Sequence, residues 1–134
     1  MIKQVYNDAL GKLILRVMLG VMLLFHGVAK IIDPSSVGYI GNVLSSHGLP
    51  AFFAYGVYIG EVIAPFMLIF GFHARMAGLL IVANMTVALL LMHSGDVFSV
   101  GKHGGWAIEL QALYLLSGLV IVFLGSGKIA VKPD

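Results

Sequence analysis

The sequence has no cysteine and few charged residues among its 134 positions. The absence of cysteine excludes disulfides, thiol redox relays, Cys-ligated zinc and covalently attached c-type haem within this chain. Only 10% of the residues are charged, whereas 60% are hydrophobic and the mean hydropathy is +1.01. A soluble domain cannot build a polar shell from this composition, so the sequence predicts an integral membrane protein. The formal net charge of +2 is too small to indicate nucleic acid binding.

Four apolar runs approach the length of a membrane span, which requires about 20 mostly apolar residues. We predict an all-α integral membrane protein in which residues 1–134 form one domain, a four-helix antiparallel transmembrane bundle. The expected transmembrane helices are 9–32, 51–72, 76–93 and 105–125. A short interfacial helix is expected over 35–47, because its apolar residues share one face and it is too short to span. The first run is longer than the apolar part of a signal peptide and is interpreted as a retained helix.

The cations gather on one side of this predicted topology. An even number of spans puts both termini on one side, and that side receives five cations: Lys3, Lys12, Arg75, Lys128 and Lys132. The other side receives only Lys30 and Lys102. By the positive-inside rule, both termini are expected in the cytoplasm.

The first span carries three polar side chains that a membrane helix seldom holds: Arg16, His26 and Lys30. At about 100° per residue they fall on one stripe with Gly20 and Gly27. The stripe is a candidate wall of a binding site. The ordinary alternative makes Arg16 a structural or snorkelling cation, His26 a satisfied interfacial residue and Lys30 an interfacial anchor.

The second span carries Glu61 near its middle, and Pro65 follows one turn later. Because proline has no N–H, the Glu61 carbonyl loses its usual helical hydrogen bond. The sequence therefore predicts a locally distorted backbone beside a buried carboxyl group, which makes Glu61 the strongest candidate for a functional role.

Unpaired charges are costly in a bilayer, at about 2.5–3.5 kcal/mol for one at the centre of a helix. Pairs are therefore favoured, and two are expected. In the first, Arg16 reaches Glu61. In the second, Glu109 of the fourth span pairs with His26 or Lys30.

The outer end of the fourth span supplies the remaining candidates. Glu109 shares a helical face with Trp106, and His103 lies in the glycine-bearing loop before it. An ordinary boundary role is the alternative for each. Small or polar residues recur every seven positions and suit close helix packing, including packing between protomers of a homo-oligomer. They are Gly104, Gln111, Gly118 and Gly125.

Metal and haem sites receive little support. Neither an HxxxH nor an ExxH spacing occurs on a single predicted helix, so no metal is expected. His26 and His93 are the one pair considered for haem, and that signal is weak.

Several motifs in order resemble those of the DoxX family of small bacterial membrane proteins. They are RxxLGxxLLxHGxxK at 16–30, GLP at 48–50, GE at 60–61, a GxxxR turn at 71–75, and WxxE followed by ALYLL within 106–116. The resemblance implies a four-helix protein of the bacterial inner membrane. Some members are named as the small subunit of thiosulfate:quinone oxidoreductase, and others are associated with quinone, catechol or oxidative stress. The lack of cysteine weakens any transfer of sulfur chemistry to this chain.

The leading hypothesis is a membrane subunit or small oxidoreductase that binds a quinone-like ring between helices in the lipid bilayer. Arg16, His26 and Lys30 are the expected hydrogen-bond donors, with His103 and Trp106 as further binding residues. Glu61 and Glu109 are the expected catalytic proton relays. No flavin, haem or iron–sulfur motif is present, so a redox partner protein would supply electrons and no covalent cofactor is expected. The alternatives are a small transporter or permeation path, and a structural subunit that docks a larger membrane complex.

Overall fold

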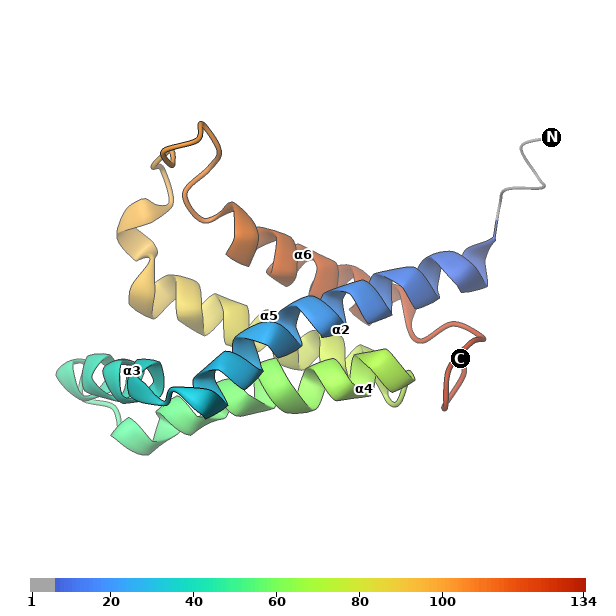
Figure 1. The fold of residues 1–134 in the computed structure, drawn as a ribbon. Coiled ribbons are helices and arrows are strands. Elements are labelled where there is room, and N and C mark those ends of the chain that lie inside the picture. Colours follow the sequence, from blue (N-terminus) through green and yellow to red (C-terminus); the bar gives the residue numbers. More distant parts are fainter. Residues whose placement is uncertain (1–6) are drawn as a thin grey trace.

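The computed structural model describes residues 7–134, and its long elements are all helical (Figure 1). In chain order the elements are α2 (Asp8–Ile32), α3 (Ser35–Ser46), η1 (Ala51–Gly56), η2 (Ile59–Ile63), α4 (Ala64–Phe70), α5 (Ala74–Met92), η3 (Ser94–Asp96) and α6 (Glu109–Leu124). Three stretches are long and apolar enough to cross a membrane: Asp8–Ile32, Ala51–Phe70 and Ala74–Met92. The prediction of an all-α membrane protein therefore holds for the described residues.

The expected fourth span is shorter than predicted. Helix α6 begins at Glu109, four residues after the expected start, and contains 16 residues. At 1.5 Å per residue it is about 24 Å long, less than the ~30 Å hydrocarbon core of a bilayer. The preceding residues form an irregular loop, in which Val100 and Trp106 make an isolated antiparallel bridge.

Helix α2 begins and ends at recognisable caps. The Asn7 side chain accepts a hydrogen bond from the Leu10 N–H at 3.0 Å, as an N-cap residue should. The helix stops before Asp33 and Pro34, where proline cannot continue it. Its buried face contains Arg16, Leu19, Gly20, Leu23 and Gly27.

The second expected span is not one continuous helix. It starts as the 3₁₀ helix η1, passes through the π-helical turn η2 and becomes regular only in α4. Pro65 lies in the first turn of α4, and Glu61 lies inside the π-helical turn. The predicted distortion beside Glu61 is therefore confirmed, because the backbone widens where proline withholds its N–H.

Helices α2 and α4 pack closely through glycine. A side chain at Gly20 would lie 2.9 Å from the Pro65 carbonyl oxygen, and one at Gly27 would overlap the Glu61 carbonyl. Helices α5 and α6 are in similar contact, because a Cβ at Gly78 would lie 2.6 Å from the Gly118 carbonyl oxygen. Gly118, one of the small residues expected to suit close helix packing, thus packs against another helix of the same chain. The core between these helices is apolar and includes Leu19, Leu23, Leu68, Ile81 and Ile121.

The interfacial helix expected over 35–47 corresponds to α3. It buries Val37, Gly41 and Leu44, and Ala54 of η1 belongs to the same small apolar cluster. Figure 1 shows α3 and the loop before α6 at one end of the bundle. The start of α2 and the segment 125–134 lie at the other end.

The segment 126–134, called here the strap, folds back over the end of the bundle that holds the start of α2. The Val131 N–H donates to the Phe70 carbonyl at 2.9 Å, and the Lys132 N–H donates to the Gly71 carbonyl at 3.0 Å. Arg75 binds the Asp134 carboxylate at 3.2 Å. Desolvation opposes ionisation of Asp134, but hydrogen bonds from Gly127, Ser126 and Arg75 outweigh it and lower its pKa.

The described cations that were predicted for one side of the membrane lie at the same end of the helical bundle. Lys12 lies in the first turns of α2, Arg75 lies in the first turn of α5, and Lys128 and Lys132 belong to the strap. All four therefore lie at one end of the bundle (Figure 1). Lys3 lies outside the described residues.

Candidate functional site

A cavity of about 850 Å³ opens between α2, α3, the η1–η2 region, α5 and α6. Most of its lining is apolar, including Leu23, Ile40, Leu91 and Met92. A few polar side chains interrupt that lining: His26, Lys30, Ser36, Glu61, Asn84, His93 and Gln111. A mostly apolar hollow with few polar groups is the usual form of a small-molecule site.

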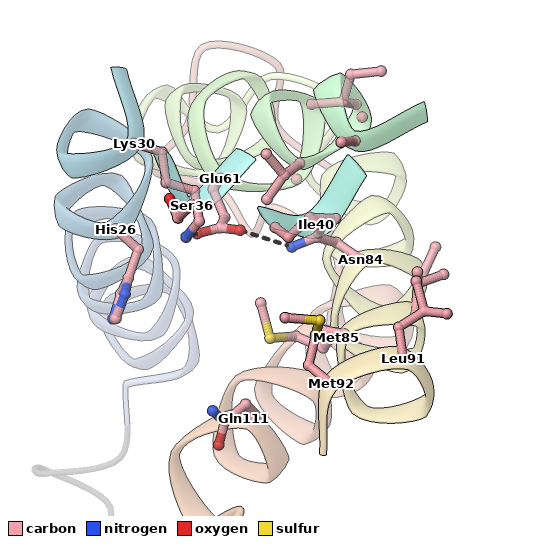
Figure 2. A pocket seen from close by; sticks show the side chains of 18 of the residues that line it. His26, Lys30, Ser36, Ile40, Glu61, Asn84, Met85, Leu91, Met92 and Gln111 are labelled. Atoms are coloured by element: carbon pink, nitrogen blue, oxygen red, sulfur yellow. Dashed lines mark hydrogen bonds and ion pairs between the residues drawn. The ribbon is translucent and has the colours of Figure 1, made fainter. Parts of the chain in front are cut away.

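The central polar contact joins Lys30 to Glu61. The Lys30 Nζ lies 2.6 Å from Glu61 Oε1, and Glu61 is only 5% exposed. The Asn84 Nδ2 donates to the other carboxylate oxygen, Oε2, at 3.3 Å. Figure 2 shows the three side chains meeting at one wall of the cavity. Both oxygens of this buried carboxylate therefore have a donor, which offsets the cost of desolvating the charge.

Local features of the sequence bring these three groups together. Gly60 leaves room for α5, since a Cβ there would lie 2.5 Å from the Asn84 Cβ. Gly27 lets α2 lie directly against the Glu61 backbone. The Tyr58 hydroxyl donates to the Lys30 carbonyl at 3.1 Å and ties the end of α2 to the start of η2.

A second polar group lies on another wall of the same cavity. The Gln111 Nε2 and the His93 Nε2 are 3.5 Å apart, and the His93 Nδ1 is 3.6 Å from an Asp96 carboxylate oxygen. Nearby, His26 meets the ring of Tyr114 edge-on, with 5.7 Å between ring centroids. The cavity therefore has polar side chains on two walls and a pair of rings between α2 and α6.

The expected Arg16–Glu61 pair is not formed. Arg16 is 1% exposed, and its Nη2 donates to the Ile129 carbonyl of the strap at 2.6 Å. Its Nε and Nη1 have no hydrogen-bond partner among the described residues. The cause is the antiparallel register, since Gly27 faces Glu61, whereas Arg16 faces Gly71. Ten residues separate Glu61 from Gly71, about 15 Å along a helix at 1.5 Å per residue.

The second expected pairing also differs from the structure. Lys30 pairs with Glu61 rather than with Glu109. Glu109 is exposed at the first turn of α6 with its carboxylate against Gly105, and it does not line the cavity. The structure thus brings Lys30, His26 and Glu61 to one hollow and leaves Glu109 outside it.

The two remaining predicted binding residues also lie outside the cavity. His103 is exposed in the loop before α6. Trp106 donates its Nε1–H to the Val97 carbonyl at 2.5 Å and is 45% exposed.

Sequence reasoning missed two residues that line the cavity, Asn84 and Gln111. Asn84 had a visible signal, because it is one of two polar side chains, with Thr86, in an otherwise apolar helix. Thr86 turns back onto its own helix, donating to the Val82 carbonyl at 2.7 Å. Among residues 7–134 no group of three potential ligands suited to a metal ion comes together.

Comparison with known proteins places this architecture in a family. The family model of DoxX matches residues 11–94, which is more than half of the chain. The chain belongs to the DoxX family. The matched range contains Arg16, His26, Lys30, Glu61 and Asn84, and it ends before α6.

Two curated relatives match over most of their length. One is named "Putative oxidoreductase CatD", from Bacillus subtilis (strain 168); it is 26% identical over 92% of this chain and 86% of its own. The other is an uncharacterized protein of Haemophilus influenzae, 32% identical over 87% of this chain and 84% of its own. No solved structure matches this DoxX-family chain.

Proposed function

We propose that this DoxX-family protein is a membrane subunit that binds a quinone in the cavity beside Lys30 and Glu61. The observation that carries the proposal is the buried Lys30–Glu61–Asn84 group, set into an otherwise apolar cavity of about 850 Å³. That volume lies in the range of about 300–1,000 Å³ typical of small-molecule pockets. A quinone suits it because the ring and tail are apolar, whereas the carbonyl oxygens require donors.

Lys30 is the donor best placed for a quinone oxygen. Its ammonium carries three N–H groups, and one of them is directed at Glu61 Oε1. A second N–H is available to a carbonyl oxygen in the cavity, and a charged donor strengthens such a bond. His26, on the same helix and lining the same cavity, is the second candidate.

The same pair is suited to moving protons. Reduction of a quinone to a quinol takes up two electrons and two protons. In this proposal the electrons come from a reduced partner protein that carries a flavin or an iron–sulfur cluster. One proton passes from Lys30 Nζ to the quinone oxygen that it contacts, and Glu61 passes on a replacement proton taken up from water. The second proton reaches the other quinone oxygen from water that enters the open cavity. The word oxidoreductase in the name of the Bacillus subtilis relative supports this direction at 26% identity.

We also propose a location and an orientation. In the bacterial inner membrane, α6 would make the fourth crossing, its short length being compensated by local thinning or by the residues around it. Lys12, Arg75, Lys128 and Lys132 would face the cytoplasm, and the cavity would open toward the outer leaflet. Cysteine scanning with a membrane-impermeant label tests this, because the chain has no cysteine of its own. Labelling from outside is expected at position 98 and is not expected at position 128.

Quinone binding is tested directly with purified protein in lipid nanodiscs. A short-tail ubiquinone analogue is dialysed to equilibrium against protein-loaded and empty discs, and bound quinone is read by ultraviolet absorbance. The double variant Lys30→Gln/Glu61→Gln keeps the wall neutral and polar but removes the charged donor, and about tenfold weaker binding is expected. Lys102→Gln, in the exposed loop, is the matched control and is expected to bind like the wild type. No saturable binding by the wild type would refute the proposal.

One observation favours a second function, a permeation path. The π-helical turn breaks the second span at its buried carboxyl group, and broken helices beside charged residues occur in transporters. Vesicles loaded with the pH dye pyranine separate the two functions. A proton leak that disappears in Glu61→Gln, without quinone binding, would favour permeation.

A further inference from the structure

We infer that the cavity selects a ligand with hydrogen-bonding groups at two opposite ends, and therefore a 1,4-quinone over its 1,2-isomer. This inference rests on the proposed quinone binding and adds the arrangement of the carbonyl groups. It comes from the second polar group of the cavity, Gln111 with His93, which the proposed function does not use.

The first pole of the cavity is the Lys30–Glu61–Asn84 group. It draws one side chain each from α2, η2 and α5. Within this group, Lys30 donates to one carboxylate oxygen of Glu61 and Asn84 donates to the other. The Lys30 ammonium has three N–H groups, so it can still donate a hydrogen bond to a ligand.

The second pole is Gln111 of α6 with His93 at the end of α5. Figure 2 shows Gln111 across the open centre of the cavity from Glu61, with the apolar Met85 and Met92 to one side. The Gln111 amide has two N–H donors and one acceptor, and its Nε2 lies 3.5 Å from the His93 Nε2. At least one Gln111 N–H is therefore available to a ligand.

The two poles lie at different heights along α5. Asn84 lies within this helix and His93 directly follows its end, nine residues later, about 13.5 Å of rise at 1.5 Å per residue. A 1,4-quinone carries its two oxygens on opposite sides of the ring, so a ring that lies between the poles directs one oxygen to each, with hydrogen bonds of about 3 Å. The rings of His26 and Tyr114, which meet edge-on at 5.7 Å, add an aromatic part to the cavity lining.

A 1,2-quinone can form hydrogen bonds with fewer of the polar groups in this cavity. Its two oxygens are adjacent, so they engage a single pole. The polar groups of the other pole then lose water without gaining a partner, which weakens binding.

The test compares two isomers of one formula, 2,5-di-tert-butyl-1,4-benzoquinone and 3,5-di-tert-butyl-1,2-benzoquinone. Each is titrated into the full chain in nanodiscs, and bound quinone is measured after equilibrium dialysis. The wild type is expected to bind the 1,4-isomer at least tenfold more tightly. The variant Gln111→Leu is expected to weaken the 1,4-isomer about tenfold and to change the 1,2-isomer less than twofold. A thermal unfolding curve verifies that each variant is folded, and His93→Leu is the second variant at the same pole.

The outcomes separate this inference from the proposed function. Equal affinity of the wild type for both isomers, or equal weakening of both by Gln111→Leu and His93→Leu, overturns the two-pole inference and leaves quinone binding in place. If neither these isomers nor the short-tail ubiquinone analogue binds, the proposed function falls as well. Retained preference for the 1,4-isomer in both pole variants also overturns the inference.

Discussion

The two residues of the Lys30–Glu61 ion pair should contribute unequally to stability. Replacement of the lysine is expected to lower the free energy of unfolding more than replacement of the glutamate. The Glu61 side chain is 6% exposed, whereas the Lys30 side chain is 20% exposed. Lys30→Gln leaves a carboxylate charge buried with only the Asn84 amide beside it, and about 3–5 kcal/mol of stability is expected to be lost. Glu61→Gln leaves an ammonium that can still reach water, and a loss of about 1–3 kcal/mol is expected. The double variant Lys30→Gln/Glu61→Gln should lie close to the smaller single loss.

A double-mutant cycle measures the coupling between these two residues. Unfolding in mixed micelles, with increasing SDS, gives the free energy of each variant, and a coupling of about 3–5 kcal/mol, equal to the larger single loss, is expected. The matched control is the pair Asp8–Lys12, also a lysine with a carboxylate, at 2.8 Å. Because its aspartate side chain is 57% exposed and the two residues are one helical turn apart, its coupling should be about 0.3–0.5 kcal/mol.

Two results would refute this reasoning. One is a Lys30–Glu61 coupling no larger than that of the control pair, which would mean that the carboxylate is not desolvated. The other is a larger loss from Glu61→Gln than from Lys30→Gln, which would mean that Lys30 is the more deeply buried partner. Either result would also remove the electrostatic basis for placing a ligand at this wall.

Three further predictions concern packing and the strap. Gly60→Ala should cost about 1–3 kcal/mol and weaken quinone binding, because the added Cβ meets Asn84 at 2.5 Å; unchanged unfolding and dialysis curves would contradict it. Gly118→Leu should cost a similar amount in the same unfolding assay by forcing α5 and α6 apart, and wild-type stability would show that this contact is loose. The Asp134 pKa is lowered in the fold, so its contribution to strap attachment is present above its unfolded pKa of about 3.9 and is lost as the pH falls through the lower folded value. Residues 126–134 should therefore be more protected from hydrogen exchange than in an Asp134→Asn control at pH 6, and this difference in protection factor should shrink near pH 3. Equal protection of the two proteins at pH 6 would contradict it.

The sequence predicted best what depends on local chemistry. The long apolar runs, the stop at Asp33 and Pro34, and the distorted backbone between Glu61 and Pro65 each follow from a few neighbouring residues. The short helix α3 follows from its length and from one apolar face.

Prediction failed where two distant segments had to be placed in register. The depth of Arg16 in its span was compatible with a reach toward Glu61, but the glycine contacts align it with Gly71. The strap then covers Arg16 with the Ile129 carbonyl, a contact 113 residues away in the chain that no periodicity reveals. Glu109 was assigned to a pair because its helix was expected to begin earlier than it does.

The register of α2 against the second span divides the charges of the first helix between two ends of the molecule. Toward one end, Lys30 meets Glu61 at the cavity, whereas toward the other end Arg16 lies under the strap and is not among the lining residues. A charged stripe on one helix thus serves two separate environments. The alignment of these charges along one face in the sequence therefore does not indicate one continuous site.

The two poles of the cavity are expected to recognise different groups of the ligand. The first pole lies wholly within residues 11–94, which the DoxX family model matches, whereas Gln111 lies in α6 beyond that range. If the two-pole inference holds, the wall carrying Lys30 and Glu61 supplies binding to one oxygen, and α6 decides which second group the ligand must present. A replacement of Gln111 by an acidic residue should then shift preference from a quinone carbonyl, which needs a donor, toward a hydroxyl group, which can donate. In the same dialysis assay, Gln111→Glu is expected to bind the matching hydroquinone more strongly than the quinone. An unchanged ratio of the two affinities would show that α6 does not determine which ligand group is recognised.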